Sequence, residues 1–298
     1  MRNSQRPQPS HNIVLISGAS TGIGLASALH LNHHGYTVFA GVRSNEDALR
    51  IKAEAQYPEA FFPVLLDITQ AEDISRVTVE IESWLQRFPE SSLSLINNAG
   101  VVVSGPMEFI PVSKLKSQFD INVFGHIALT QSVLPLIRRN QSGKNRGKIV
   151  MISSISGLHV TPFVGPYAAS KFALEAFSDA LRQELYPWNI PVVLVEPGSI
   201  QTPLWKKAKS TAAELLSEYP AEAIPLYQRA YELMQKASAE AEAGGISVEP
   251  VAILIHHILS APKPKSRYLI GRETQFIPLL RFLPDSWLDS LLRHKIGL

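Results

Sequence analysis

The amino-acid sequence predicts an α/β fold, a doubly wound parallel sheet with helices on both faces. Short β-branched or apolar runs alternate along the 298 residues with longer segments of helical periodicity, which is the pattern of βαβ units. The strand runs are almost continuously apolar, as expected for strands that are covered on both faces. No internal repeat, low-complexity linker or charge block divides the chain. We therefore expect one domain at residues 11–271, between a tail at 1–10 and an extension at 272–298.

The individual elements can be assigned from these runs. Strands are expected at residues 13–17, 37–42, 62–66, 93–97, 148–153, 192–196 and 268–270. Helices are expected at about 23–34, 45–56, 71–87, 113–139, 166–186 and 248–259. Pro135 is expected to bend or end the fourth helix, because proline disrupts helical hydrogen bonding. The segment 206–245 is rich in helix-forming residues, and we interpret it as a helical insertion that covers a substrate site.

The composition excludes several functional classes. Lys plus Arg (28) and Asp plus Glu (26) nearly balance, so no surface for nucleic acid is expected. The chain has no cysteine, which excludes disulfides, thiolate nucleophiles and Cys-ligated zinc. No run approaches the roughly 18 apolar residues of a membrane-spanning helix. The polar N-terminus has no secretory signal, so a cytoplasmic protein is expected.

A glycine-rich turn follows the first expected strand. The run SGASTGIG (17–24) places three glycines where a strand passes into a helix. There the chain bends tightly, and backbone N–H groups at the helix N-terminus can bind a pyrophosphate. An ordinary turn is the alternative, and the position within the first βαβ unit favours nucleotide binding. The expected cofactor contacts in this turn are Gly18, Ser20, Thr21, Gly22, Ile23 and Gly24.

The ends of the next strands offer further cofactor contacts. An NAD-specific site usually has an acidic residue at the end of the second strand, but here Val42 is followed by Arg43. The Arg43 guanidinium can pair with a 2′-phosphate, which favours NADP(H) over NAD(H), although it also fits an ordinary surface arginine. Asp67 can accept a hydrogen bond from the adenine amino group or cap the next helix. The turn after the fourth strand allows close approach of a cofactor, or is a plain turn, at Asn98, Ala99 and Gly100.

Acid–base chemistry is indicated by Tyr167 and Lys171, which lie four residues apart on one face of an expected helix. An ammonium about 4 Å from a phenolate, at an effective dielectric constant of about 20, lowers the phenol pKa by up to about three units. Tyr167 can then exchange protons near neutral pH. Ser154, Ser153 and Ser156 can each hold a substrate oxygen at the end of the fifth strand. A solvent-exposed helix face is the alternative for the Tyr–Lys pair.

Six motifs in order resemble the classical short-chain dehydrogenase/reductase family over about residues 11–271. They are SGASTGIG (17–24), NNAG (97–100), DINVFG around Asn122, ISSISG (152–157), YAASK (167–171) and EPGSIQTP (196–203). The resemblance implies a Rossmann fold, a nicotinamide cofactor and an oxidoreductase that interconverts an alcohol with a ketone or aldehyde. Ser17 and Glu196 depart from the family pattern, but neither replaces a catalytic group.

The resemblance also implies roles for individual residues. The family places its serine thirteen residues before the tyrosine, which selects Ser154. Tyr167 then resembles the acid/base, and Lys171 the group that lowers its pKa and binds the nicotinamide ribose. Asn122 resembles the residue that holds a proton-relay water. The implied nicotinamide contacts are Pro197, Gly198 and Thr202.

A bulky apolar small-molecule substrate, similar to a steroid, retinoid or lipid, is implied by similarity to the steroid and retinol dehydrogenase branch of the family. The similarity lies in VFAGVR (38–43), in GLHVTPFVGPY (157–167) and in the hydrophobic C-terminal extension. Ordinary loop packing is the alternative for the candidate pocket residues, which are His159, Val160, Phe163 and Val164.

Two other functions are considered. A catalytically silent NADP-binding regulator would not need the complete set of Asn122, Ser154, Tyr167 and Lys171. A sugar-nucleotide epimerase shares the Tyr–Lys pair but would need a different glycine spacing and a larger substrate domain.

Partners and metals are less constrained by the sequence. We expect a homodimer or homotetramer, and no metal site, because the pairs at 33–34 and 256–257 are histidines without clustered carboxylates. Apolar residues at helical spacing in 275–292 indicate packing on the fold or on a partner subunit. Peripheral membrane contact is the alternative for this extension.

Overall fold

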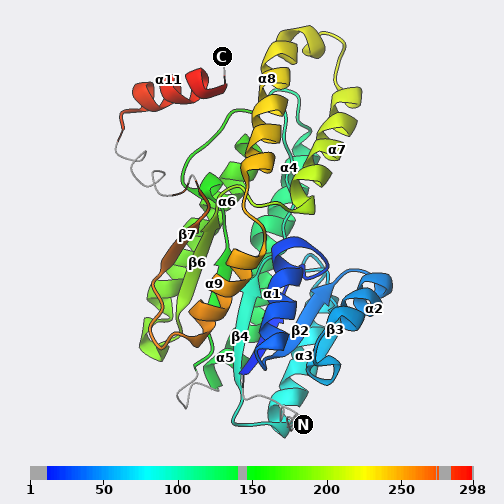
Figure 1. Ribbon diagram of the computed structural model, residues 1–298, viewed down its shortest axis with the longest axis vertical. Coiled ribbons are helices and arrows are strands. Elements are labelled where there is room, and N and C mark those ends of the chain that lie inside the picture. Colours follow the sequence, from blue (N-terminus) through cyan, green and yellow to red (C-terminus); the bar gives the residue numbers. More distant parts are fainter. Residues whose placement is uncertain (1–11, 140–145, 273, 275–282, 297–298) are drawn as a thin grey trace, which may run out of the picture.

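Parallel strands form the centre of the computed structural model, which describes residues 12–139, 146–272, 274 and 283–296 (Figure 1). The strands are β1 (Asn12–Ile16), β2 (Thr37–Val42), β3 (Phe61–Leu65), β4 (Ser92–Asn97), β5 (Ile149–Ile152), β6 (Val192–Pro197) and β7 (Arg267–Ile270). They pair in parallel in the order β3-β2-β1-β4-β5-β6-β7. The chain therefore reverses its direction across the sheet between β1 and β4, and a ligand crevice is expected at the carboxyl ends of these two strands.

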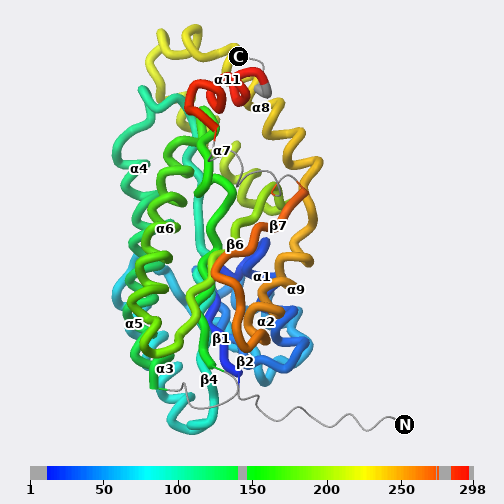
Figure 2. Tube along the Cα trace, turned by 90° about the vertical axis from the view of Figure 1, so that its left-hand side faces the viewer, coloured from blue at the N-terminus to red at the C-terminus, as the bar shows by residue number. Residues whose placement is uncertain are grey.

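Helices cover both faces of this sheet (Figure 2). One face packs against α1 (Gly22–His33), α2 (Asn45–Glu54) and α9 (Glu249–Ser260). The other packs against α3 (Ala71–Arg87), α5 (His126–Arg139) and α6 (Gly165–Glu184). Within β1, the side chains of Ile13 and Leu15 pack on the face covered by α3, α5 and α6, and Val14 packs on the face covered by α1, α2 and α9. Because side chains alternate along a strand and both faces are covered, the strand runs are apolar throughout.

The observed elements confirm the fold class predicted from the sequence. Each strand lies within one residue of its expected bounds. The helix expected at 113–139 is instead three consecutive pieces, α4 (Val112–Phe119), a π-helical turn η2 (Asp120–Gly125) and α5. Of the two alternatives for Pro135, the one in which it ends the helix is wrong, since α5 continues through it to Arg139. A bend at Pro135 stays a prediction. The short 3₁₀ turns are η1 (Pro58–Ala60), η3 (Ile155–Gly157) and η4 (Tyr186–Trp188).

The segment expected as an insertion forms two helices beyond the carboxyl ends of the strands. They are α7 (Pro203–Glu218) and α8 (Ala223–Gly244), which run side by side in Figure 1. Lys209 of α7 pairs with Glu242 of α8 at 2.6 Å. The Tyr227 hydroxyl of α8 donates to the Glu108 carboxylate at 2.9 Å, which ties the pair to the loop before α4.

The C-terminal extension is described only in part. Helix α11 (Asp285–Ile296) contacts α8 and leaves Trp287 and Leu291 exposed. The expected tail at 1–10 and the apolar residues expected at 276, 279 and 280 lie outside the described residues. Within the described part of the chain, no helix has the length and apolarity needed to cross a membrane.

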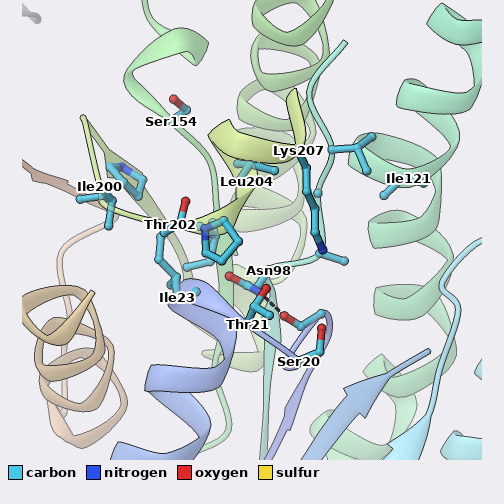
Figure 3. A pocket seen from close by; sticks show the side chains of 18 of the residues that line it. Ser20, Thr21, Ile23, Asn98, Ile121, Ser154, Ile200, Thr202, Leu204 and Lys207 are labelled. Carbon is cyan, nitrogen blue, oxygen red and sulfur yellow. Dashed lines mark hydrogen bonds between the residues drawn. The ribbon is translucent and has the colours of Figure 1, made fainter. Parts of the chain in front are cut away.

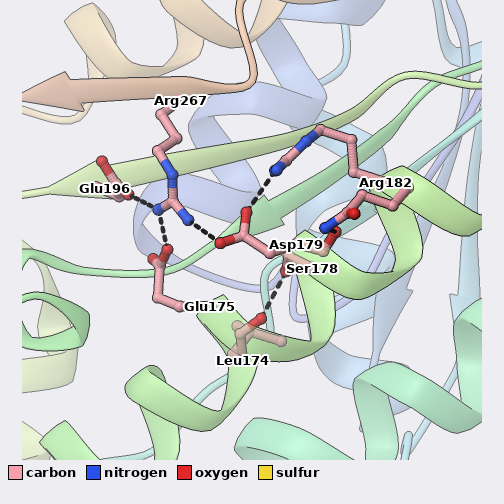
Figure 4. A network of polar contacts seen from close by, with 8 residues as sticks. Leu174, Glu175, Ser178, Asp179, Arg182, Glu196 and Arg267 are labelled. Carbon is pink, nitrogen blue, oxygen red and sulfur yellow. Dashed lines mark hydrogen bonds and ion pairs between the residues drawn. The ribbon is translucent and has the colours of Figure 1, made fainter. Parts of the chain in front are cut away.

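A buried charged cluster joins β6, β7 and α6 (Figure 4). The Arg267 guanidinium bonds to Glu196 and to Asp179, both at 2.6 Å, and also to Glu175. The Glu196 side chain is fully buried. Burial and the neighbouring Glu175 carboxylate raise the pKa of Glu196, and Arg267 opposes that rise. Glu196, which departs from the family pattern, therefore has its counter-ion on the adjacent strand.

We predict that Arg267→Leu lowers the free energy of unfolding by about 3 kcal/mol at pH 8, because it leaves buried carboxylates without their cation. The loss should shrink towards pH 5, because a carboxyl whose pKa is raised on folding protonates there and no longer needs the cation. Urea denaturation at the two pH values measures both effects. Arg139→Leu, which removes an exposed pair with Glu82, is the control and should cost less than about 1 kcal/mol. An equal Arg267→Leu loss at both pH values would contradict the explanation.

Candidate active site

The glycine-rich turn between β1 and α1 lies against the turn that follows β4. Gly18 and Gly22 have φ values of +66° and +59°, which favour glycine. A Cβ on Gly18 would lie 2.8 Å from the Ala99 Cα, and one on Gly24 would lie 2.3 Å from the Gly18 carbonyl oxygen. Gly18 and Gly24 are therefore required by close backbone approach, and the sequence pattern has a structural cause at both positions.

Asn98 fixes this contact. Its side-chain amide donates to the carbonyl oxygens of Ser17 at 3.0 Å and Gly18 at 2.9 Å. In return the Ser17 hydroxyl accepts from the backbone N–H groups of Asn98 and Ala99. The side chains of Asn98 and Ser17 thus hold the two turns together, so the departure from the family pattern at Ser17 carries a clear structural role.

His126 also supports the turn after β4, and the sequence analysis did not single it out. It is fully buried, and its Nε2 donates to the Ala99 carbonyl oxygen at 2.7 Å. Burial lowers the pKa of His126 to about 3, so the imidazole is neutral at physiological pH. Its Nδ1 lies 3.2 Å from the Asn97 side-chain oxygen. Nothing in a single histidine within DINVFGH indicates this role, because the partners come from β4.

One cavity runs from the glycine-rich turn to the end of β5 and α6 (Figure 3). Most of the residues predicted from sequence to bind cofactor line it, whereas Gly24 lies behind it. The predicted cofactor residues on its wall are Gly18, Ser20, Thr21, Gly22, Ile23, Arg43, Asp67, Asn98, Ala99, Gly100, Tyr167, Lys171, Pro197, Gly198 and Thr202.

The residues present suit a dinucleotide. Helix α1 begins at Gly22 with no side-chain cap from Thr21 and no acidic residue in its first turn. Its first backbone N–H groups and the positive end of its dipole therefore face the cavity without a competing carboxylate. This is the arrangement that binds a phosphate at a helix N-terminus.

Two cations stand at the edge of this cavity. Arg43 is exposed and has no hydrogen-bond or ion-pair partner among the described residues. Lys207, from α7, also lines the cavity, and Figure 3 shows its side chain extending from α7 into it. Lys207 lies in the segment 206–245 that was expected to cover a substrate site, but it was not singled out, because a lysine in a Lys-rich helix gives no sign that its own side chain enters the cavity.

Asp67 has a local partner as well as a place on the cavity wall. Its carboxylate accepts from the Thr69 backbone N–H at 2.9 Å and from the Thr69 hydroxyl at 2.7 Å. The alternative that Asp67 caps the next helix is wrong, because α3 begins at Ala71 with Gln70 as its N-cap and no side-chain cap. A contact with adenine stays a prediction.

Ser154, Tyr167 and Lys171 come together at the other end of the cavity. All three side chains are buried, at 8%, 5% and 3% exposure, yet all line the cavity. The Lys171 ammonium donates to the Ile152 carbonyl oxygen at 2.8 Å and lies 5.7 Å from the centroid of the Tyr167 ring. The Ser154 hydroxyl accepts from the Ser156 N–H at 3.1 Å, so its own proton can be donated to the Tyr167 oxygen or to a substrate oxygen.

The protonation state of Tyr167 differs from the expectation. Burial raises its pKa to about 12, and a hydrogen bond with Ser154 offsets only part of that rise. The prediction that Lys171 brings the phenol pKa towards neutral is therefore wrong for this structure. Burial also lowers the pKa of Lys171 to about 8, so the ammonium is charged at neutral pH. The spacing of four residues predicted the neighbour correctly, but it contains no information on burial.

Asn122 lies behind the cavity, within the π-helical turn η2. Its side-chain oxygen accepts from the Val101 N–H, and its amide donates to the Val101 carbonyl oxygen, both at 2.9 Å. The amide also donates to the Ser170 hydroxyl at 3.0 Å, which itself donates to the Tyr167 carbonyl oxygen. Asn122 thus positions the backbone of the Tyr167 helix. The water-holding role implied by the family stays a prediction.

The residues expected to bind substrate are only partly brought to the cavity. Ser154 lines it, but His159, Phe163 and Val164 do not. The His159 ring lies 3.0 Å from the Ile155 carbonyl oxygen, and the Phe163 ring meets Tyr227 of α8 edge-on. Val164 packs in an apolar cluster with Tyr167.

That apolar cluster includes cavity residues that the sequence did not indicate. Trp205 and Leu204 of α7 line the cavity, and the Trp205 ring lies 6.1 Å from the Tyr167 ring, edge-on. Val102 and Ala208 complete the cluster. The only available signal was that Leu204 and Trp205 directly follow EPGSIQTP, the last of the six motifs.

The chain is similar in sequence and in structure to known short-chain dehydrogenases. Residues 12–213 match a family model described as short chain dehydrogenase. The chain is 36% identical over 279 residues to an NADPH-dependent 3-dehydrocapnine reductase of Ornithobacterium rhinotracheale, covering 93% of this chain and 94% of that one. It is 30% identical to the mitochondrial D-beta-hydroxybutyrate dehydrogenase of Mus musculus, covering 89% and 78%. A solved short-chain dehydrogenase from Streptomyces avermitilis matches with TM-score 0.73 and 28% identity, over 96% and 98% of the two chains.

Proposed function

This chain belongs to the short-chain dehydrogenase/reductase family, and from that premise we propose that it is an NADP(H)-dependent oxidoreductase that interconverts a bulky apolar alcohol with its ketone or aldehyde. One observation carries the proposal. Ser154, Tyr167 and Lys171 open onto the same cavity as the uncapped N-terminus of α1. A bound dinucleotide and a substrate carbonyl would therefore meet beside a proton donor.

The acid–base step is assigned to Tyr167. When bound, the nicotinamide supplies or accepts the hydride, with its two electrons, at the substrate carbon. In the direction of reduction, the Tyr167 hydroxyl gives its proton to the substrate oxygen, which becomes the alcohol. Because burial keeps the phenol protonated at neutral pH, Tyr167 is poised as the acid of reduction. An alkoxide is a stronger base than a phenolate, so this transfer is favourable.

The groups beside Tyr167 orient the substrate oxygen and compensate the negative charge on the phenolate. The Ser154 hydroxyl, held by the Ser156 N–H, donates a hydrogen bond to the substrate oxygen. Lys171, held by the Ile152 carbonyl oxygen, offsets the negative charge left on the phenolate and, in the family role, would bind the nicotinamide ribose. Asn122 keeps the Tyr167 helix in register and, in the family role, holds a water for proton return.

The preference for NADP(H) rests on charge. The two residues at the end of β2, Val42 and Arg43, include no carboxylate, and both Arg43 and Lys207 line the cavity. A 2′-phosphate would pair with Arg43, and Lys207 from α7 lies within the same cavity wall. The relative named as NADPH-dependent supports the same choice.

The substrate class rests on the apolar wall beside Tyr167. Leu204 and Trp205 line the cavity and belong to one apolar cluster with Tyr167. Val102, Val164 and Ala208 of the same cluster pack behind the lining. This cluster favours an apolar body next to the reacting carbonyl. His159 and Phe163 stay candidates for more distant contacts, because neither lines the cavity and the Phe163 ring packs against Tyr227 of α8.

The remaining expectations are retained as part of this proposal. Residues 11–271 form the Rossmann-type domain, with 206–245 as its lid, flanked by the tail 1–10 and the extension 272–298. A cytoplasmic homodimer or homotetramer is proposed. Phe172 and Phe177 on α6 are 41% and 46% exposed, which provides apolar surface for a second subunit.

We predict that Tyr167→Phe lowers NADPH-dependent carbonyl reduction by at least about a thousandfold, because the proton donor is lost, while NADPH binding is retained. Turnover is followed by NADPH absorbance on a panel of steroids, retinoids and simple ketones, and the bulky members should be preferred. Tyr186→Phe, at an exposed tyrosine, is the control and should have no effect. Unchanged turnover in Tyr167→Phe would refute the assigned acid and leave a cofactor-binding regulator as the better account.

We further predict that Arg43→Ala raises the dissociation constant for NADPH about tenfold or more and leaves that for NADH unchanged, because only NADPH has the 2′-phosphate. Fluorescence titration with each dinucleotide measures the two constants. Arg87→Ala is the control, since Arg87 stacks on Trp84 at the far end of α3. An equal loss for both dinucleotides would contradict a 2′-phosphate contact.

A further inference from the structure

Three histidines meet on the face of the sheet covered by α1 and α9. His30 lies in the last turn of α1, His34 caps its C-terminus and His256 lies in α9. Their candidate ligand nitrogens all lie within 4.8 Å of one another. The ring centroids are 4.2 Å apart for His30 and His34, and 4.3 Å apart for His34 and His256. Two helices distant in sequence thus bring three imidazoles to one point.

The hydrogen bonding of His34 prepares it as a ligand. Its Nδ1 lies 2.8 Å from the His30 carbonyl oxygen, which can only accept, so Nδ1 carries the proton. The Nε2 lone pair is then left available. A backbone carbonyl that holds one ring nitrogen and fixes the tautomer is the usual outer partner of a metal-binding histidine.

Other titratable groups surround the three histidines. Burial and the neighbouring histidines lower the pKa values of His30 and His256. His33 and Tyr36 of the adjoining segment and His257 of α9 are the other titratable groups nearby. His33 pairs with Gln56, on the α2 side.

We propose that His30, His34 and His256 form a site for one divalent transition-metal ion of the zinc class, with its remaining coordination position open to water. Zn²⁺ bound by three histidines at about 2.0–2.1 Å requires ligand nitrogens roughly 3.4 Å apart. The candidate nitrogens lie within 4.8 Å of one another, so the three side chains must move closer together to reach that spacing. Imidazoles without a carboxylate suit Zn²⁺, Cu²⁺ or Ni²⁺ and do not suit Mg²⁺ or Ca²⁺.

The three histidines lie away from the proposed active site, and a metal bound by them would link α1 to α9. The glycine-rich turn is at the N-terminal end of α1, about 18 Å from the histidine end for a helix of 12 residues. A metal bound by α1 and α9 would bind the folded chain in preference to the unfolded one and so stabilise it. The proposal departs from the sequence expectation of no metal, which considered adjacent histidine pairs and could not place His30 beside His256.

Titration of the untagged, full-length chain with Zn²⁺ by calorimetry tests the site. We expect one ion per chain and a thermal midpoint that rises with Zn²⁺ and falls back with EDTA. His256→Gln and His30→Gln should each weaken binding by about tenfold or more and abolish the thermal shift. His257→Gln, the neighbouring exposed histidine, is the matched control and should bind as wild type does.

Co²⁺ provides a second readout. Its visible absorption should take the intensity of a tetrahedral site in wild type and His257→Gln and lose it in His256→Gln. Melting in EDTA shows whether each variant is folded, and NADPH turnover in EDTA should be equal in all of them. Equal Zn²⁺ affinity in folded wild type, His30→Gln and His256→Gln would overturn the site without affecting the proposed reaction.

Discussion

The bridge made by the Asn98 amide to the carbonyl oxygens of Ser17 and Gly18 is the interaction on which the site depends. It joins β1 to β4 where the strand order reverses, so the two halves of the sheet open a single crevice. Gly18 and Gly24 allow the backbones to approach this closely. The bridge also leaves the N-terminus of α1 directed into that crevice, facing the catalytic end of α6 across it.

Burial then sets the chemistry of the catalytic end. Tyr167, Lys171 and Glu175 succeed one another by four residues on α6, and Arg267 balances the charge behind them. Burial of these side chains favours the neutral phenol of Tyr167. Burial also lowers the pKa of Lys171 to about 8, so the lysine is charged only below that pH. The site is therefore arranged as a proton donor with a nearby positive charge, while α7 supplies the apolar wall.

The sequence was informative where a local pattern has a local cause. Strands covered on both faces must be apolar, and a turn with three glycines has few other uses, so the sheet and the cofactor end were predictable. The positions of Lys207 and Trp205 on the cavity wall were not predictable, because they depend on how α7 packs over the cavity. The pairing of Arg267 with Glu196 was not predictable either, because it depends on the pairing of β7 with β6. His30 and His256 meet only through the packing of α1 on α9. The raised pKa of Tyr167 shows the same limit, since spacing identifies a neighbour but cannot measure burial.

The pH dependence of single-turnover carbonyl reduction, with saturating NADPH, tests the central claim most directly. A buried, protonated Tyr167 beside a charged Lys171 predicts a rate that is constant from about pH 6 to 7.5. The rate should fall above about pH 8, where Lys171 loses its proton and the phenolate loses its compensating charge. A rate that rises steadily with pH across this range would show that the phenolate is the active form, and would contradict the account.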